Sequence, residues 1–102
     1  MKITKSLQLL IKIARLVGLN EQDIKSAEEL LNHREYGLSF DTLITQIFEY
    51  NIEISNEIYE LIIYIGHKLK LPEKNYLYME ELVGGSQELP HHLKLEIAKI
   101  IG

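Results

Sequence analysis

Apolar residues recur at intervals of three and four along almost the whole chain, and this spacing limits the possible folds more than any other feature. It places apolar side chains on one face of an α-helix, whereas a strand would need alternation at every second residue. Only two prolines and six glycines interrupt the 102 residues. The sequence therefore predicts an all-α protein, a compact antiparallel helical bundle of about five to six helices in one domain, residues 1–102.

Turn and capping residues divide the N-terminal half of this pattern. Gly18 is a candidate stop for the first helix, and Asn20 offers a side-chain oxygen to the free amides of a second helix. We expect a turn around residues 35–37, because Gly37 is permissive and one helix from residue 21 to 51 would exceed the usual length. The second and third helices are therefore predicted to form a hairpin, with the third ending at about Tyr50.

Further boundaries are predicted in the C-terminal half. Ser55 is the candidate N-cap of a fourth helix, which is the most apolar one and is expected at the centre of the bundle. Pro72 is expected to end this helix and to begin a short fifth helix as far as Leu82, before the glycine pair at Gly84. Pro90 is expected as the first residue of a last helix.

Residues that catalyse reactions or bind metals show no characteristic motif. The absence of cysteine removes disulfides, thiolate nucleophiles and zinc fingers together. The four histidines form no H-E-x-x-H motif, and the i, i+4 spacing of His92 and Glu96 arises often by chance. The serines form no G-x-S-x-G elbow, and Gly84-Gly85-Ser86 lacks the strand and Lys-Ser or Lys-Thr of a phosphate-binding loop. We expect no enzyme activity, metal or cofactor.

The apolar N-terminal stretch does not have the pattern of an export signal. Lys12 and Arg15 interrupt it, and no small-residue cleavage site follows. The longest uncharged run, from Thr42 to Phe48, is far below the roughly 18 apolar residues of a membrane span. We therefore expect a cytoplasmic protein that does not enter a membrane.

Charge is distributed unevenly along the chain. Residues 1–18 carry four basic and no acidic side chains, residues 19–66 carry ten acidic and two basic ones, and residues 67–102 are balanced, for an overall charge of −4. Proteins that bind nucleic acids or anionic membranes usually present positive charge to phosphate. The negative balance therefore disfavours both as direct partners, and a monomer is the expected state in the absence of a partner.

The acidic residues of the middle part recur at helical spacing. Asp41 and Glu49 share one side of the predicted third helix, and further acids and tyrosines follow on the fourth. Two neighbouring helices would then present one acidic face that attracts a basic protein, although solvated helix surfaces commonly carry such charges. The residues predicted to contact a partner are Tyr36, Asp41, Glu49, Glu53, Glu57, Glu60 and Tyr64.

One segment of the sequence is similar to a known family. The stretch EYGLSFDTLITQIFEYNI at residues 35–52 resembles the MafI family of bacterial immunity proteins. Residues 27–31 before it, and residues 54–59, Ile65-Gly66 and Leu71-Pro72 after it, agree with the same family, so the resemblance covers about residues 7–83. The segment after Gly84 departs from the family's pattern.

The resemblance implies a small cytoplasmic protein that neutralises a cognate secreted or contact-dependent toxin by stoichiometric binding. Toxins paired with this family include nucleases, among them EndoU-like ribonucleases, so the implied partner is a nuclease domain with a basic surface. The alternative is a helical adaptor or regulatory module that receives an amphipathic helix of a cellular partner in an apolar groove. A nucleic-acid reader built on the basic first helix ranks third.

Overall fold

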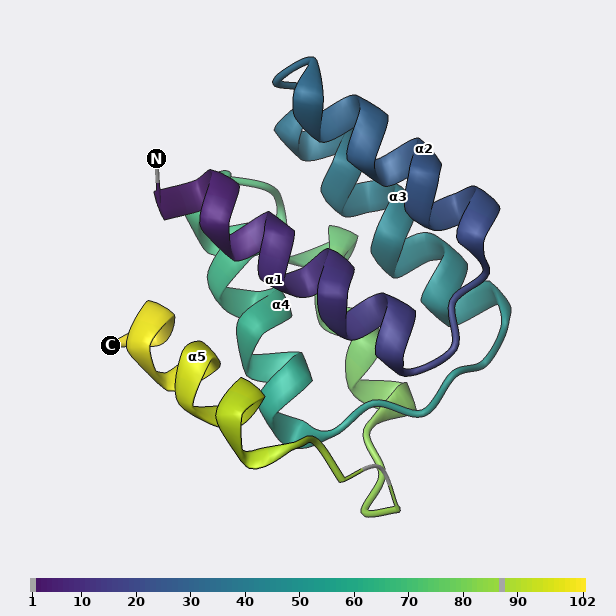
Figure 1. The fold of residues 1–102 in the computed structure, drawn as a ribbon, viewed down its shortest axis with the longest axis vertical. Coiled ribbons are helices and arrows are strands. Elements are labelled where there is room, and N and C mark those ends of the chain that lie inside the picture. Colours follow the sequence, from purple (N-terminus) through teal and green to yellow (C-terminus); the bar gives the residue numbers. More distant parts are fainter. Residues whose placement is uncertain (1, 87) are drawn as a thin grey trace.

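Five α-helices and two 3₁₀-helices make up the part of the chain that the computed structural model describes, residues 2–86 and 88–102 (Figure 1). In chain order the helices are α1 (Lys2–Leu16), α2 (Glu21–Asn32), α3 (Tyr36–Glu49), α4 (Asn56–Lys68), η1 (Glu73–Asn75), η2 (Leu77–Leu82) and α5 (His91–Ile101). Within the described residues, extended pairing is limited to one isolated bridge between Ile54 and Val83. The predicted all-α bundle is confirmed.

The central helix of the bundle is α1, which packs against α2, α3, α4 and α5. Its buried residues include Leu7, Leu10 and Ile13, none of which has exposed surface. We expected α4 at the centre because of its apolar content; α4 also packs against four elements, but only two of them, α1 and α5, are α-helices. Leu9 and Ile13 extend the buried side of α1 well beyond the narrow stripe of a surface helix, so α1 contacts all four other α-helices.

The predicted caps are confirmed. The side chain of Asn20 accepts a hydrogen bond from the amide of Asp23 at 2.9 Å, and Oγ of Ser55 accepts one from the amide of Ile58 at 3.2 Å. Gly18, with φ of 107°, ends α1 as expected. The capping chemistry in these loops is therefore local, as the sequence indicated.

The predicted α2–α3 hairpin is present, but its turn does not use Gly37, which lies inside α3. Arg34 takes the left-handed conformation instead, with φ of 60°. The amide of Glu35 then donates to the carbonyl of Leu30 at 2.8 Å, and the amide of Arg34 donates to that of Leu31 at 2.9 Å. These paired bonds are a Schellman motif, which satisfies free carbonyls at a helix end.

Helices α3 and α4 end in the same way, at Asn51 and Lys70. Their φ angles are 52° and 58°, and the amides that follow, of Ile52 and Leu71, bond back to carbonyls five residues earlier. Four successive helices thus stop with a Schellman motif, and only the first uses glycine.

The single fifth helix expected as far as Leu82 is wrong, because the chain there forms the two 3₁₀-helices η1 and η2. The buried residues Tyr76, Met79 and Leu82 are spaced by three, which matches the three residues per turn of a 3₁₀-helix better than the 3.6 of an α-helix. Pro72 and Pro90 each lie one position before a helix, as N-caps rather than first residues.

Tyr76 joins this segment to the core. Its side chain is 1% exposed, and its ring meets that of Phe40 edge to face with centroids 6.4 Å apart. On its other side the ring packs on Gly66 of α4.

Membrane-spanning helices are absent from residues 2–86 and 88–102, because none of the helices there combines the length and the hydrophobicity that a span requires.

Candidate functional site

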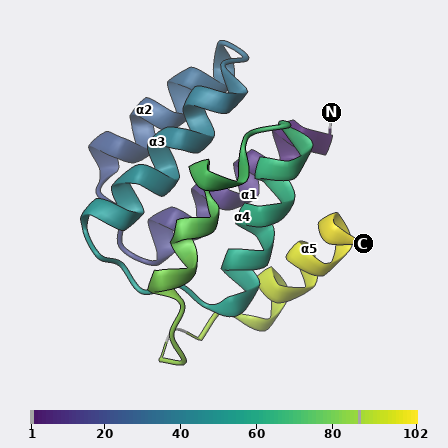
Figure 2. The same cartoon turned by 180° about the vertical axis from the view of Figure 1, so that it is seen from behind.

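The predicted contact residues do not lie on one face of two neighbouring helices. In the rear view of the molecule η2 lies between α3 and α4 and packs against both, while α1 packs against both from the other side (Figure 2). Asp41 and Glu49 belong to α3, whereas Glu57 and Glu60 belong to α4. The single acidic face expected from the sequence is therefore divided by η2.

A smaller surface joins α3 to η2, and we call it the α3–η2 surface. Four of its residues lie on α3, where Asp41, Thr45 and Glu49 recur at intervals of four and Phe48 adjoins Glu49, and the fifth is Tyr78 of η2. The rings of Phe48 and Tyr78 meet edge to face, with centroids 4.9 Å apart and planes at 89°. Oγ1 of Thr45 donates a hydrogen bond to Oδ1 of Asp41 at 3.5 Å, and Thr45 also lies close enough to the hydroxyl of Tyr78 to affect its pKa.

Burial raises the pKa of Tyr78, the hydrogen bond from Thr45 lowers it, and the negative charge of Asp41 raises it again. The net shift is upward from an ordinary value of 10.0, so the phenol stays protonated at neutral pH. The α3–η2 surface therefore combines a neutral phenol and an aromatic pair with the carboxylates of Asp41 and Glu49, both exposed. A protonated tyrosine hydroxyl can donate or accept a hydrogen bond from a partner.

Two aromatic residues of this region were not among the predicted contacts. The apolar spacing of Leu43, Ile44, Ile47 and Phe48 predicts that Phe48 is on the buried face of the third helix, but Phe48 is 36% exposed, and Tyr50 just beyond it is 58% exposed. The adjacent residues Leu43 and Ile44 of the same helix are both fully buried, so helical spacing alone does not exclude Phe48 from the core beside Ile47. Neither the exposure of Phe48 nor the position of Tyr78 against α3 could be predicted from the sequence.

The predicted aromatic anchors Tyr36 and Tyr64 lie elsewhere. Tyr36 is partly buried against the core at the start of α3. The ring of Tyr64 on α4 lies under two lysine amines, with Nζ of Lys2 at 5.7 Å and Nζ of Lys68 at 5.5 Å from its centroid. A basic partner would meet positive charge there, so Tyr64 is a poorer anchor for such a partner than Phe48 or Tyr78.

Glu53 has an internal role. It precedes Ile54, whose backbone bonds to Leu82 and Gly84 at 3.0 Å each, so the α3–α4 connection is tied to the end of η2. The amide of Ser86 donates to Oε2 of Glu53 at 2.9 Å, and the hydroxyl of Ser86 donates to the same oxygen. The glycine-rich segment 84–86 thus surrounds a carboxylate of this chain.

A Cβ atom on Gly84 would come within 2.5 Å of that carboxyl group, so glycine makes room for it. Glu53 therefore fixes the loop that follows η2. Glu57, which is partly buried, and Glu60, which is exposed, lie on α4 and remain predicted contacts.

Part of the positive charge of α1 is paired within the fold. Nε of Arg15 lies 2.9 Å from Glu21, and its Nη2 lies 3.7 Å from Glu28. The hydrogen bond from Arg15 holds the pKa of the Glu21 carboxyl below its usual range. Another basic residue of α1, Lys12, has its Nζ 4.0 Å from the carboxylate of Glu96.

Metal binding has no candidate site in the part of the chain that the structure describes. No cluster of three or more His, Asp or Glu side chains there could hold a metal ion.

No family model, curated protein or solved structure matches this chain. The resemblance to MafI immunity proteins therefore remains a prediction from the residues quoted above. The α3–η2 surface, described from this chain alone, is the candidate site for a protein partner.

Proposed function

We propose that the protein is an immunity protein that binds a cognate toxin domain through the α3–η2 surface and neutralises it stoichiometrically in the cytoplasm. The observation that carries this proposal is the contact of the exposed Phe48 with the partly buried Tyr78, beside the exposed carboxylates of Asp41 and Glu49. Aromatic side chains are frequent anchors of protein interfaces, and exposed carboxylates steer a basic partner toward them. Asp41 and Glu49 are retained from the sequence prediction, and Phe48 and Tyr78 are added to it.

A nuclease is the partner class that this chemistry favours. Nucleases bind phosphate and therefore carry basic clefts, so a compact acidic surface is complementary to them. The resemblance of residues 35–52 to MafI proteins supports the same class, including EndoU-like ribonucleases. The proposed mechanism is binding alone, without a catalytic step by this chain.

The test begins with the neighbouring reading frame: if a large secreted protein with a nuclease domain at its C-terminus is encoded immediately upstream, that domain is the probe. The two chains are co-expressed and co-purified, and toxin activity is measured against increasing amounts of this protein. A complex with equimolar inhibition is expected. Failure of the two purified chains to form a complex would contradict the proposal.

Two variants locate the interface. Asp41→Lys with Glu49→Lys is expected to slow association about tenfold or more and to reduce its dependence on salt. The matched control is Glu29→Lys with Glu35→Lys, which changes the net charge equally at exposed positions near the α2–α3 turn. Equal slowing by both pairs would show that overall charge, not the α3–η2 surface, steers the partner.

The aromatic anchor is tested separately. Phe48→Ala is expected to raise the dissociation rate about 30-fold, the equivalent of about 2 kcal/mol for an anchor residue. Circular dichroism of the free variant checks that the fold is kept. An unchanged dissociation rate in a folded variant would place the interface elsewhere.

A further inference from the structure

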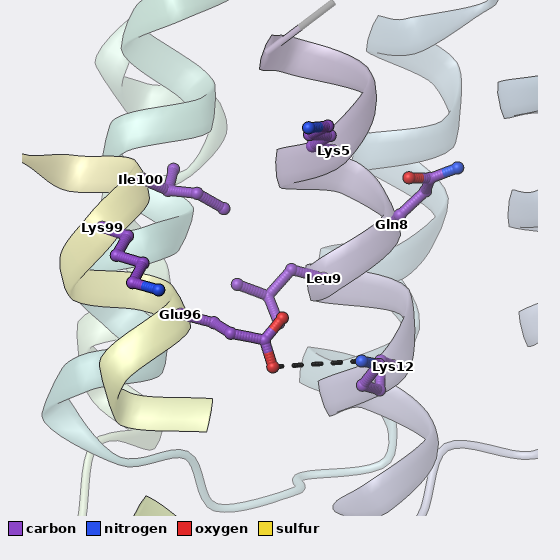
Figure 3. A pocket seen from close by; sticks show the side chains of 7 residues that line it. All are labelled: Lys5, Gln8, Leu9, Lys12, Glu96, Lys99 and Ile100. Atoms are coloured by element: carbon purple, nitrogen blue, oxygen red, sulfur yellow. Dashed lines mark ion pairs between the residues drawn. The ribbon is translucent and has the colours of Figure 1, made fainter. Parts of the chain in front are cut away.

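A second surface with the opposite charge lies between α1 and α5. A hollow of about 660 Å³ there is lined by Leu9 and Ile100, with Lys5, Lys12 and Lys99 around it (Figure 3). Helices α1 and α5, which line it, lie on the side of the bundle nearer the viewer in Figure 1, whereas η2 is nearer in the opposite view of Figure 2. The two surfaces are therefore built on elements from opposite sides of the bundle.

The hollow continues along the contact between the two helices. A second hollow of about 260 Å³ shares Lys12 and extends to Leu16, which is 54% exposed. From Lys5 to Leu16 the groove follows twelve residues of α1, whose eleven steps of 1.5 Å span about 16 Å or three helical turns. We call these two hollows together the α1–α5 groove.

Positive charge predominates around the larger hollow although the whole chain is acidic. Three lysines face one acid, Glu96, whose contact with Lys12 at 4.0 Å is between exposed side chains. Such exposed pairs bind weakly and exchange readily with a partner's charge. Within residues 2–86 and 88–102, Lys5 and Lys99 form no ion pair.

We propose that the α1–α5 groove binds an acidic amphipathic helix of a protein partner. The exposed Leu16 and the partly buried Ile100 would receive apolar side chains of the partner, with Leu9, only 4% exposed, at the floor of the larger hollow, which is the usual arrangement of a helix in a groove. Lys5 and Lys12 are seven residues apart, so carboxylates two turns apart on the partner would lie beside them. Charge complementarity selects an acidic helix and disfavours the basic toxin domain proposed for the α3–η2 surface.

Designed peptides test this proposal with the full-length protein. The probe is a stapled helix of about four turns with leucines along one face and glutamates beside them. One comparison peptide replaces every glutamate with lysine, and another replaces every leucine with serine. Dissociation constants come from fluorescence anisotropy, and the site comes from amide shifts in NMR spectra.

The acidic amphipathic peptide is expected to bind, with amide shifts confined to α1 and α5. Lys5→Glu with Lys99→Glu is expected to raise its dissociation constant about tenfold or more. The matched control, Lys25→Glu with Lys74→Glu, alters net charge equally at exposed positions outside the groove and is expected to bind as the native protein does.

Several results would overturn the proposal. It would be contradicted if the acidic peptide does not bind, or if the two variants weaken its binding equally. Equal binding of either comparison peptide, or amide shifts on α3 and η2, would also contradict it. If the molecular mass in solution increases with protein concentration, and if self-association abolishes peptide binding, the groove would instead be the contact with a second copy of this chain. The Lys5→Glu and Lys99→Glu variant should inhibit the toxin normally, so this proposal and the proposed function fail independently.

Discussion

Gly66 is the position where a small change tests the packing of this fold most directly. A Cβ atom at Gly66 would lie 2.5 Å from Cδ1, 2.6 Å from Cε1 and 2.8 Å from Cγ of Tyr76. The ring of Tyr76 is 1% exposed and packs edge-on against Phe40. Because Cγ is close to the backbone, the ring cannot move aside unless the junction of η1 and η2 moves with it.

Two opposing contributions set the stability of Gly66→Ala. Alanine is favoured over glycine inside a helix by about 0.5–1 kcal/mol. Overpacking a buried contact costs about 1–3 kcal/mol. The packing contribution is larger here, so we expect Gly66→Ala to destabilise the protein by about 1–2 kcal/mol, although helix propensity alone predicts stabilisation.

Urea denaturation followed by far-ultraviolet circular dichroism measures this effect. Gly37→Ala is the control, because nothing lies within 4 Å of a Cβ atom there, and it is expected to stabilise α3. In a Tyr76→Leu background the cost of Gly66→Ala should shrink, as a double-mutant cycle would show. A Gly66→Ala protein as stable as the native one, or a cost that stays the same in the Tyr76→Leu background, would refute the reasoning.

Three further predictions concern helix ends and tyrosines. Lys70→Gly is expected to stabilise the protein by up to about 1 kcal/mol, because Lys70 has a left-handed φ of 58° that glycine adopts more easily. Urea denaturation measures this change, and a lower midpoint than that of the native protein would contradict it. Ser55→Ala is expected to cost about 1 kcal/mol in the same assay, since it leaves the buried amide of Ile58 without its cap, and Ser55→Thr should restore most of the loss. Burial raises the pKa of both Tyr59 and Tyr78 above the ordinary 10.0, so their contribution to stability is complete below about pH 10 and lost as pH rises through the folded-state values. Urea midpoints measured across that range should fall less in a protein carrying Tyr59→Phe and Tyr78→Phe than in the native one, and parallel decreases would show that other groups cause the loss.

The sequence by itself determined the helical class and several helix ends. The caps at Asn20 and Ser55 bond to amides three residues away, so the chemistry that forms them lies within one turn. The stop at Gly18 is equally local. Apolar spacing likewise placed Asp41 and Glu49 on one side of α3.

The end of α3 at about Tyr50 was predicted from the sequence, but only the tertiary structure decided the conformation in which α2, α3 and α4 stop. Asn51 and Lys70 adopt left-handed conformations that glycine would favour, and no glycine marks them in the sequence. The residues that follow, Ile52 and Leu71, pack against the core, which holds the preceding residue in that conformation. The position of α1 at the centre also depends on how the other helices pack around it.

The candidate site likewise combines features that the sequence determined with features that only the tertiary structure decided. The acids of α3 were predicted from spacing, but the contact of Phe48 with Tyr78 and that of Glu53 with Ser86 join residues far apart in the chain. Helical periodicity reports which side of one helix is apolar, and it carries no information on which helices adjoin. Here η2 is inserted between α3 and α4 because Tyr76, Met79 and Leu82 bury themselves there, and this packing divided one expected acidic face into separate surfaces.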